Sequence, residues 1–250
     1  MIKEVEDAFD KTTKIIFGRS LGKLSLYEKW LQQNTPGGRF VKSAHGNKTI
    51  FLPNLSIHKF VKEGVADALE AFGENSEIRL DIADKDLFSL GREFAKNATL
   101  VCEFTEGKNQ NVIDSIFYLN AQNMYKIAFC FHSRYCAYNI WSSFNEYTFG
   151  CYRNMNSSFD INCYFSTELV RCFEMDACRK CSDAMFCHNC ENVHESMFCF
   201  NTKNKRYAIG NLEVGKDNYL KMKKKILDSF VAELEKTSGL ELNIYNVLCR

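Results

Sequence analysis

Between residues 130 and 202, apolar and polar positions repeat with a period of three. Ten of the twelve cysteines share one phase of this repeat, which we call the cysteine register: Cys130, Cys136, Cys151, Cys163, Cys172, Cys178, Cys181, Cys187, Cys190 and Cys199. The other register positions carry mostly small residues, and the aromatic residues of this window lie one residue to either side. An α-helix needs a spacing near 3.6 residues and a flat strand a spacing of two, so neither explains the pattern.

A spacing in multiples of three is typical of a solenoid with six-residue sides, each a short strand followed by a corner. We therefore predict an α+β chain built around a cysteine-rich parallel β-solenoid. Three sides give an 18-residue coil, which is our expectation, and a two-sided 12-residue coil also preserves the register. Thiols at matching corners stack at the strand spacing of about 4.8 Å. Phe149, Ile161, Phe173 and Met185 recur at multiples of six, and we expect them to point inward.

Three regions follow from where the repeat begins and ends. Residues 1–120 lack it and are predicted to form a mixed α/β region, residues 121–205 form the solenoid, and residues 206–250 form a capping strand, helix and tail. Helical spacing of apolar residues indicates a capping helix over residues 216–236. In the first region the pattern predicts a hairpin over residues 39–53, helices over 24–33, 56–72 and 84–96, and strands over 78–82 and 100–104.

The composition indicates which partners and which compartment to expect for the protein. The formal net charge is +1 and 25% of residues are charged, so no overall field attracts nucleic acid. The N-terminus is charged and lacks the apolar core of a signal peptide, and no run of about 18 apolar residues is present to span a membrane. We expect a cytoplasmic or otherwise intracellular protein, or one in a particle assembled there, with reduced thiols and no membrane contact.

Two CxxC pairs, Cys178 with Cys181 and Cys187 with Cys190, are the strongest chemical signal. Four thiolates can bind zinc tetrahedrally. The gap between the pairs is shorter than in zinc ribbons, however, and both pairs belong to the cysteine register. We favour thiols as small buried residues and keep zinc as the alternative cofactor. His188 and His194 lie beside these cysteines and His132 lies near Cys130, but each is expected at the surface.

A run of aromatic residues recurs every three positions: Tyr135, Tyr138, Trp141, Phe144 and Tyr147. Such a run can form an interaction surface for a partner, and it can equally form a buried second layer. The sequence leaves both open.

The segments Leu169–Val214 (beginning LVRCFEMDACRKC) and Ala8–Arg19 (AFDKTTKIIFGR) resemble cysteine-rich proteins of archaeal genomes. These segments cover about a quarter of the chain. The group carries no assigned activity, so the resemblance implies an archaeal type of protein and transfers no site residues.

The leading functional hypothesis is a non-enzymatic structural or assembly protein. Its solenoid would present a rigid surface within a larger complex or a virion-like particle, with protein partners or copies of itself. The alternative is a zinc-binding interaction module built on the CxxC pairs. A third hypothesis, a solenoid enzyme like the hexapeptide-repeat acyltransferases, is disfavoured because the register carries Cys and Ser where that family has Ile, Val or Leu.

Overall fold

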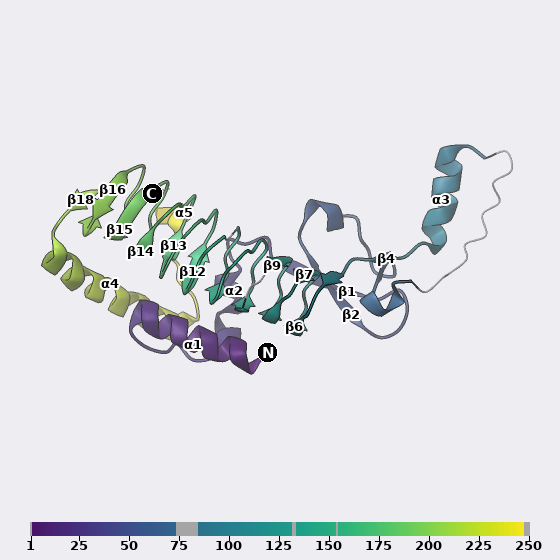
Figure 1. Ribbon diagram of the computed structural model, residues 1–250, viewed down its shortest axis with the longest axis horizontal. Coiled ribbons are helices and arrows are strands. Elements are labelled where there is room, and N and C mark those ends of the chain that lie inside the picture. The colour runs from purple at the N-terminus through teal and green to yellow at the C-terminus, as the bar shows by residue number, and fades with distance from the viewer. Residues whose placement is uncertain (1, 74–84, 132–133, 154, 248–250) are drawn as a thin grey trace.

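The computed structural model describes residues 2–73, 85–131, 134–153 and 155–247. Its centre is a β-solenoid of about nine turns over residues 104–209, which confirms the predicted class and begins before the expected boundary at residue 121. Helices flank the solenoid on one side, and an arm (residues 38–73 and 85–101) projects from its N-terminal end (Figure 1). The strand expected over residues 78–82 lies outside the described residues.

The strands of the solenoid are short and follow one another along the chain. The first group is β5 (Phe104–Glu106), β6 (Gln110–Ile113), β7 (Phe117–Leu119), β8 (Gln122–Tyr125), β9 (Phe129–Phe131) and β10 (Arg134–Ala137). The second group is β11 (Thr148–Phe149), β12 (Asp160–Cys163), β13 (Phe173–Met175), β14 (Ser182–Met185), β15 (Glu191–Met197), β16 (Lys203–Arg206), β17 (Ala208–Ile209) and β18 (Leu212–Glu213). They form an eleven-stranded sheet that runs from β6 to β18 and a three-stranded sheet, β5-β7-β9.

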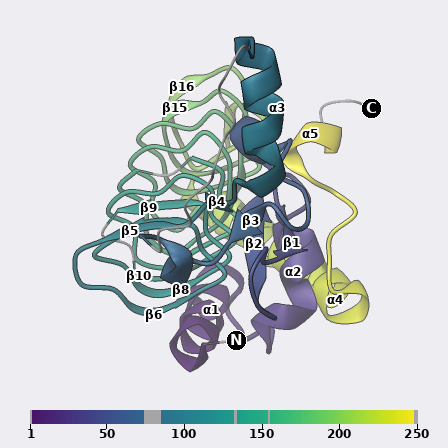
Figure 2. The same cartoon turned by 90° about the vertical axis from the view of Figure 1, so that its right-hand side faces the viewer.

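The coil is shorter than we expected. Strands pair in parallel with partners twelve residues apart, as Ile161 pairs with Phe173 and Phe117 with Phe129, except that β5 pairs with β7 thirteen residues on; the 18-residue coil is therefore wrong. The two sheets are the two faces of the coil, and coils stack behind one another along the axis (Figure 2). We use "column" for residues that are paired on successive coils, twelve apart except between β5 and β7. The solenoid ends in an antiparallel turn, where β17 pairs with β18.

The backbone explains why the period is three. From Asn111 to Tyr207, every described non-glycine residue with a positive φ lies immediately before a register position. Asn is common among these residues because its side chain tolerates the left-handed conformation best. Stacked pairs such as Asn111 and Asn123, 2.9 Å apart, join their amides across coils. A left-handed residue in this place bends the chain and turns the register side chain that follows it inward.

The cysteine register lines the interior, as predicted: all ten of its cysteines are buried. The expected inward column behaves differently. Phe149, Ile161, Phe173 and Met185 point out of the coil and are buried under helices. This part of the prediction is wrong because a strand alternates its side chains, so residues next to inward ones face outward.

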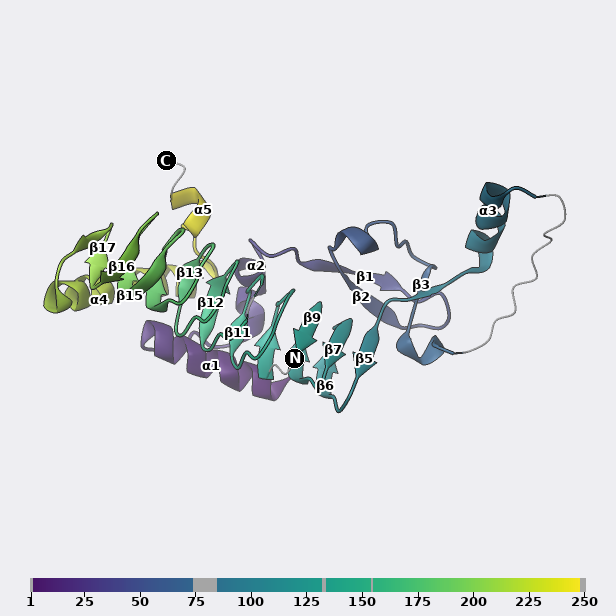
Figure 3. The same ribbon diagram turned by 45° about the horizontal axis from the view of Figure 1, so that its top comes forward.

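Two helices cover that outward column. They are α1 (Lys3–Phe17) and α4 (Lys216–Thr237), and they follow one another along one side of the solenoid (Figure 3). The rings of Phe9 and Phe149 are 5.3 Å apart, and those of Phe17 and Phe173 are 5.0 Å apart. The helix predicted over residues 216–236 is thus confirmed and packs on the last coils.

Short elements complete the covered side. The helix expected over residues 24–33 is the 3₁₀ helix η1 (Leu24–Tyr27) followed by α2 (Glu28–Leu31), and the tail expected to be extended contains α5 (Ile244–Val247). The tail docks through a buried carboxylate: Glu174 accepts hydrogen bonds from Asn162 Nδ2 at 2.7 Å and Ile244 N at 3.2 Å.

The arm differs most from expectation. Its hairpin of β1 (Gly38–Lys42) and β2 (Thr49–Pro53) is confirmed, and so is the helix α3 (Leu87–Asn97). The helix predicted over residues 56–72 is wrong. In its place are η2 (Ser56–His58), β3 (Ala66–Asp67) and η3 (Leu69–Ala71), with Gly64 at positive φ between them. β3 pairs in parallel with β4 (Leu100–Val101).

Candidate interaction surface

The five aromatic residues singled out from the sequence do not form one surface. Because the coil has twelve residues, positions three apart run around it and only positions twelve apart align. Tyr135 and Tyr147 share a column with ring centres 5.5 Å apart, and Phe159 continues that stack. Tyr138 is buried. Trp141 and Phe144 lie elsewhere on the coil and are exposed, Trp141 by 50%.

A different set of residues lines up along the three-stranded sheet. We call it the aromatic face, and it consists of Phe104, Phe117, Leu119, Phe129, Phe131 and Trp141. The ring centres along its main column are 5.0, 5.3 and 5.4 Å apart from Phe104 to Trp141. Each contact joins neighbouring coils, so the stack rises at the coil spacing. Of this set, only Trp141 stands out in the sequence, because the pattern that identifies the others requires the coil length.

The aromatic face is apolar, and no element among the described residues covers it. Side chains on these strands alternate, so Tyr118 and Cys130 are buried inward while their neighbours point out. Phe104 and Trp141 at its two ends are exposed, and the residues between them are partly buried by their own stacking. Glu106, at one end, is the charged residue on strands β5, β7 and β9. A contiguous apolar sheet face of this kind marks a binding surface.

The cysteines proposed as zinc ligands lie inside the solenoid. Cys178 and Cys190 share one interior column, and Cys181 and Cys187 lie in others. Among the residues that the structure describes, no three His, Cys, Asp or Glu side chains gather as a metal site. The zinc interpretation stays a prediction, and metal analysis of the purified protein is its test.

Thiol chemistry follows burial in this core. Burial raises the pKa of Cys136 to about 12 and that of Cys181 to about 11, because an interior without water disfavours the thiolate. Cys190 and Cys199, both buried, are exceptions: a hydrogen bond with the Cys187 thiol lowers the pKa of each, that of Cys199 to about 7. Reactive cysteines need a low pKa together with access to solvent, and Cys199 is buried. These thiols therefore act as packing groups.

The described histidines near the cysteines lie outside the cysteine core. The Nδ1 atom of His188 contacts the Asp176 carboxylate on the preceding coil, and His194 is exposed. His132 lies outside the described residues. Neither described side chain belongs to the cysteine core; His194 is exposed, as expected, and His188 is partly buried.

A Ser-His-Asp cluster that the sequence did not reveal lies in the arm. Asp67 is buried and accepts from Ser43 Oγ at 2.7 Å, and its other oxygen lies 2.6 Å from His45 Nδ1. The hydrogen bond with His45 is the main reason that the pKa of Asp67 is lowered to about 2. A nucleophilic serine would contact the histidine ring, and here it contacts the aspartate. The cluster therefore closes the hairpin loop against β3.

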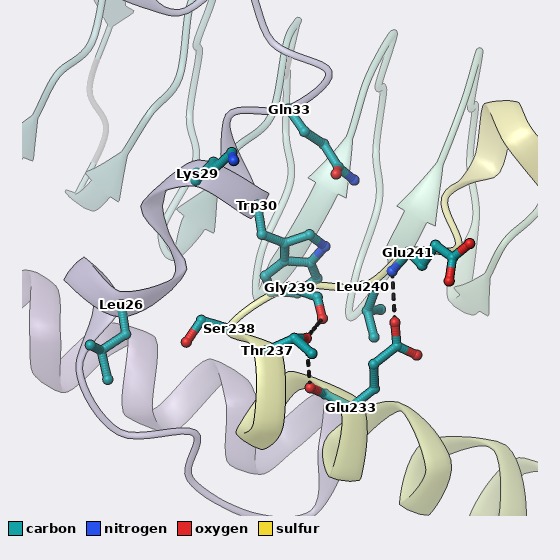
Figure 4. A pocket seen from close by; sticks show the side chains of 10 residues that line it. All are labelled: Leu26, Lys29, Trp30, Gln33, Glu233, Thr237, Ser238, Gly239, Leu240 and Glu241. Atoms are coloured by element: carbon teal, nitrogen blue, oxygen red, sulfur yellow. Dashed lines mark hydrogen bonds between the residues drawn. The ribbon is translucent and has the colours of Figure 1, made fainter.

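One open pocket of about 470 Å³ lies where the end of α4 meets η1 and α2 (Figure 4). Trp30, Leu26 and Leu240 line it, with Glu233 accepting from the backbone of Glu241 at 2.7 Å. The Trp30 Nε1 donor is buried and has no hydrogen-bond partner among the described residues. A ligand site needs several convergent polar groups, and one orphan donor does not define a ligand.

Comparison with known proteins adds no relative. No known protein-family model matches the chain, and neither a curated protein nor a solved structure is similar to it. The archaeal type suggested by the sequence stays a prediction. Within the described residues, no helix combines the length and apolar character needed to cross a membrane.

Proposed function

We propose that this chain is a structural protein that presents a rigid solenoid face to protein partners within an assembly. The aromatic face carries this proposal. Six large apolar side chains are held in register on successive coils, at a site where the described chain places no covering element. Association would remove the apolar area that these side chains still expose from water, which stabilises a contact by about 25 cal/mol per Å².

Rigidity supports the same role. The solenoid interior is filled by small side chains, and α1 and α4 brace the opposite side over several coils. A preorganised surface loses little conformational entropy when it binds. Fixed spacing between coils also suits a protein that sets the positions of its neighbours.

The decisive experiment isolates the protein from its source and measures the size of the particle that contains it. It compares the wild-type chain with a variant that carries a charge on the aromatic face. We expect the wild-type chain to migrate as a complex well above its own 28.9 kDa, and Trp141→Glu to release it. Glu146→Arg, at an exposed position outside the aromatic face, is the matched control and should leave the complex intact. A wild-type protein that is monomeric in its source, with Trp141 open to solvent, contradicts the proposal.

A further inference from the structure

The arm carries a second apolar surface that no other described part of the chain covers. None of the side chains of α3 is buried, and Leu87 and Phe88 are 80% and 81% exposed. Leu87, Leu90, Gly91 and Phe94 share one face of the helix by their spacing, while Arg92 and Lys96 lie on the other. A helix of eleven residues is marginal in water without packing, although Asp86 caps this one by accepting from the backbone of Phe88 and Ser89.

The apolar stripe of α3 fits the aromatic face in length and spacing. A helix rises 1.5 Å per residue, so the steps from Leu87 to Leu90 and from Leu90 to Phe94 are about 4.5 and 6 Å. Coils repeat at about 4.8 Å, so one helix side chain falls near each coil. The stripe from Leu87 to Phe94 is therefore about 10.5 Å long and matches three of the four rings in the column from Phe104 to Trp141, which spans about 14 Å.

This molecule already uses the same packing on its other side. On α1, Phe9 and Phe17 are eight residues apart and contact Phe149 and Phe173, which are two coils apart. An amphipathic helix laid along the solenoid axis is therefore a contact that these coils accept. Layers of helix on sheet are also the ordinary way in which both elements bury their apolar sides.

The connection to the solenoid prevents α3 from reaching its own aromatic face. Residues 98–103 join α3 to Phe104, and β4 within them is held by β3, with Leu100 N donating to Val65 O at 2.8 Å. Folding back would break this pair. In the structure α3 projects beyond the N-terminal end of the solenoid, away from the sheet (Figures 1 and 3). The face that it can reach belongs to another molecule.

We propose that α3 of one chain packs along the aromatic face of a second copy, and that the second copy's α3 returns the contact. This inference rests on the proposed function and names the partner as another copy of the same chain. Reciprocal exchange gives a closed two-fold dimer, the commonest symmetry of protein assemblies. Two such contacts bury on the order of 1,500 Å², within the range of stable interfaces.

Sedimentation of the full chain over a range of concentrations tests the pairing. The wild-type chain should form dimers, and both Leu87→Glu on α3 and Trp141→Glu on the face should raise the dissociation constant by at least about tenfold. Lys96→Glu, on the polar side of α3, is the matched control and should dimerise as the wild type does. Mixing the Leu87→Glu and Trp141→Glu chains should restore a heterodimer, because one intact helix and one intact face remain.

Each other result overturns the proposal in a distinct way. If Trp141→Glu dimerises normally, α3 pairs with α3; if Leu87→Glu dimerises normally, the two faces pair directly. Circular dichroism checks that the variants fold, and Phe94→Glu offers a second exposed position on the apolar stripe of α3. A wild-type chain that stays monomeric also contradicts the proposal. If the purified chain is monomeric but complexes from the source still depend on Trp141, the partner is not a second copy and the proposed function stands. If those complexes do not depend on Trp141, the pairing and the proposed function both fail.

Fluorescence provides an independent readout. The chain has two tryptophans, and Trp30 is buried at 3% exposure while Trp141 is half exposed. Iodide should quench Trp141 in the Leu87→Glu chain and be excluded from it in the wild-type dimer. A monomer in which Trp141 is already shielded would show that the arm closes on its own face, against this inference.

Discussion

At the residue scale, the sequence predicts which side chains are buried better than it predicts whether they point into or out of the coil. The phase of the cysteines was sufficient to place them inside the coil, because only small side chains fit where coils stack closely. The orientation of Phe149 and Phe173 could not be obtained in this way. Periods of twelve and eighteen both preserve a three-residue register, and the assignment of columns to faces depends on which one is real. The same ambiguity hid the aromatic face and made residues three apart look aligned.

The packing role of the thiols leads to a size-dependent prediction. Cys163 is buried in the core column between Cys151 and Met175. Cys163→Ala should lower the free energy of unfolding by about 1 kcal/mol, and Cys163→Leu should lower it by about 1–3 kcal/mol because added atoms force coils apart. Urea unfolding measures both. Cys102→Leu, outside the solenoid, is the control, and equal stability for the Leu and Ala variants at position 163 would contradict the size argument.

The buried carboxyl of Glu174 should make the free energy of unfolding depend on pH. Burial raises the pKa of its carboxyl from the ordinary 4.5 to about 7, against the hydrogen bonds from Asn162 and Ile244 that favour the charged form. The folded state thus holds this proton more tightly than the unfolded state does. Its stabilising effect is complete below pH 4.5 and is lost as pH rises to about 7, by about 3 kcal/mol. Unfolding of Glu174→Gln, compared with wild type from pH 5 to 8, should lack this slope; identical slopes would exclude the carboxyl as its source.

At the scale of elements, helical periodicity identified α3 and α4 but was misleading for residues 56–72. There, Gly64 adopts a positive φ that breaks the helix, and Val61 and Ala66 join the buried cluster under the hairpin. Tertiary contacts therefore determine the secondary structure of this segment and override its local helical pattern. The helix α1 went unrecognised even though Val5, Phe9 and Ile16 lie at helical spacing and are buried. Its partner column on the solenoid is more than a hundred residues away.

The docking of α1 is open to a direct test. Phe9 is fully buried between Tyr27 and Phe149, with ring centres 5.8 and 5.3 Å away. Phe9→Ala should lower the free energy of unfolding by about 3–5 kcal/mol, since it removes an aromatic ring and leaves a cavity. Ile15→Ala, on the exposed side of the same helix, should change it by less than about 0.5 kcal/mol. If the two variants are equally stable in urea, α1 does not pack as described.

At the scale of the whole molecule, the two flanking helices join coils that otherwise touch only their neighbours. Repeat arrays of this kind can lose cooperativity and unfold in parts. Here α1 and α4 meet over one coil: Phe173 packs against Phe17 at 5.0 Å and against Phe230 at 6.0 Å. The coils before and after Phe173 are thus connected through a shared side chain as well as through the sheet.

This connection predicts that the solenoid unfolds as one unit. Native-state hydrogen exchange should give the same opening free energy for amides of β10–β12 and of β14–β15 in the wild-type chain. Phe173→Ala removes the shared contact. The amides of β10–β12 and of β14–β15 should then have different opening free energies, whichever group opens first. Phe165→Ala, at an exposed position on the other face, should keep them coupled. Separate opening already present in the wild-type chain would show that the helices brace their own coils independently, and a rigid span of nine turns would then have to come from the sheet alone.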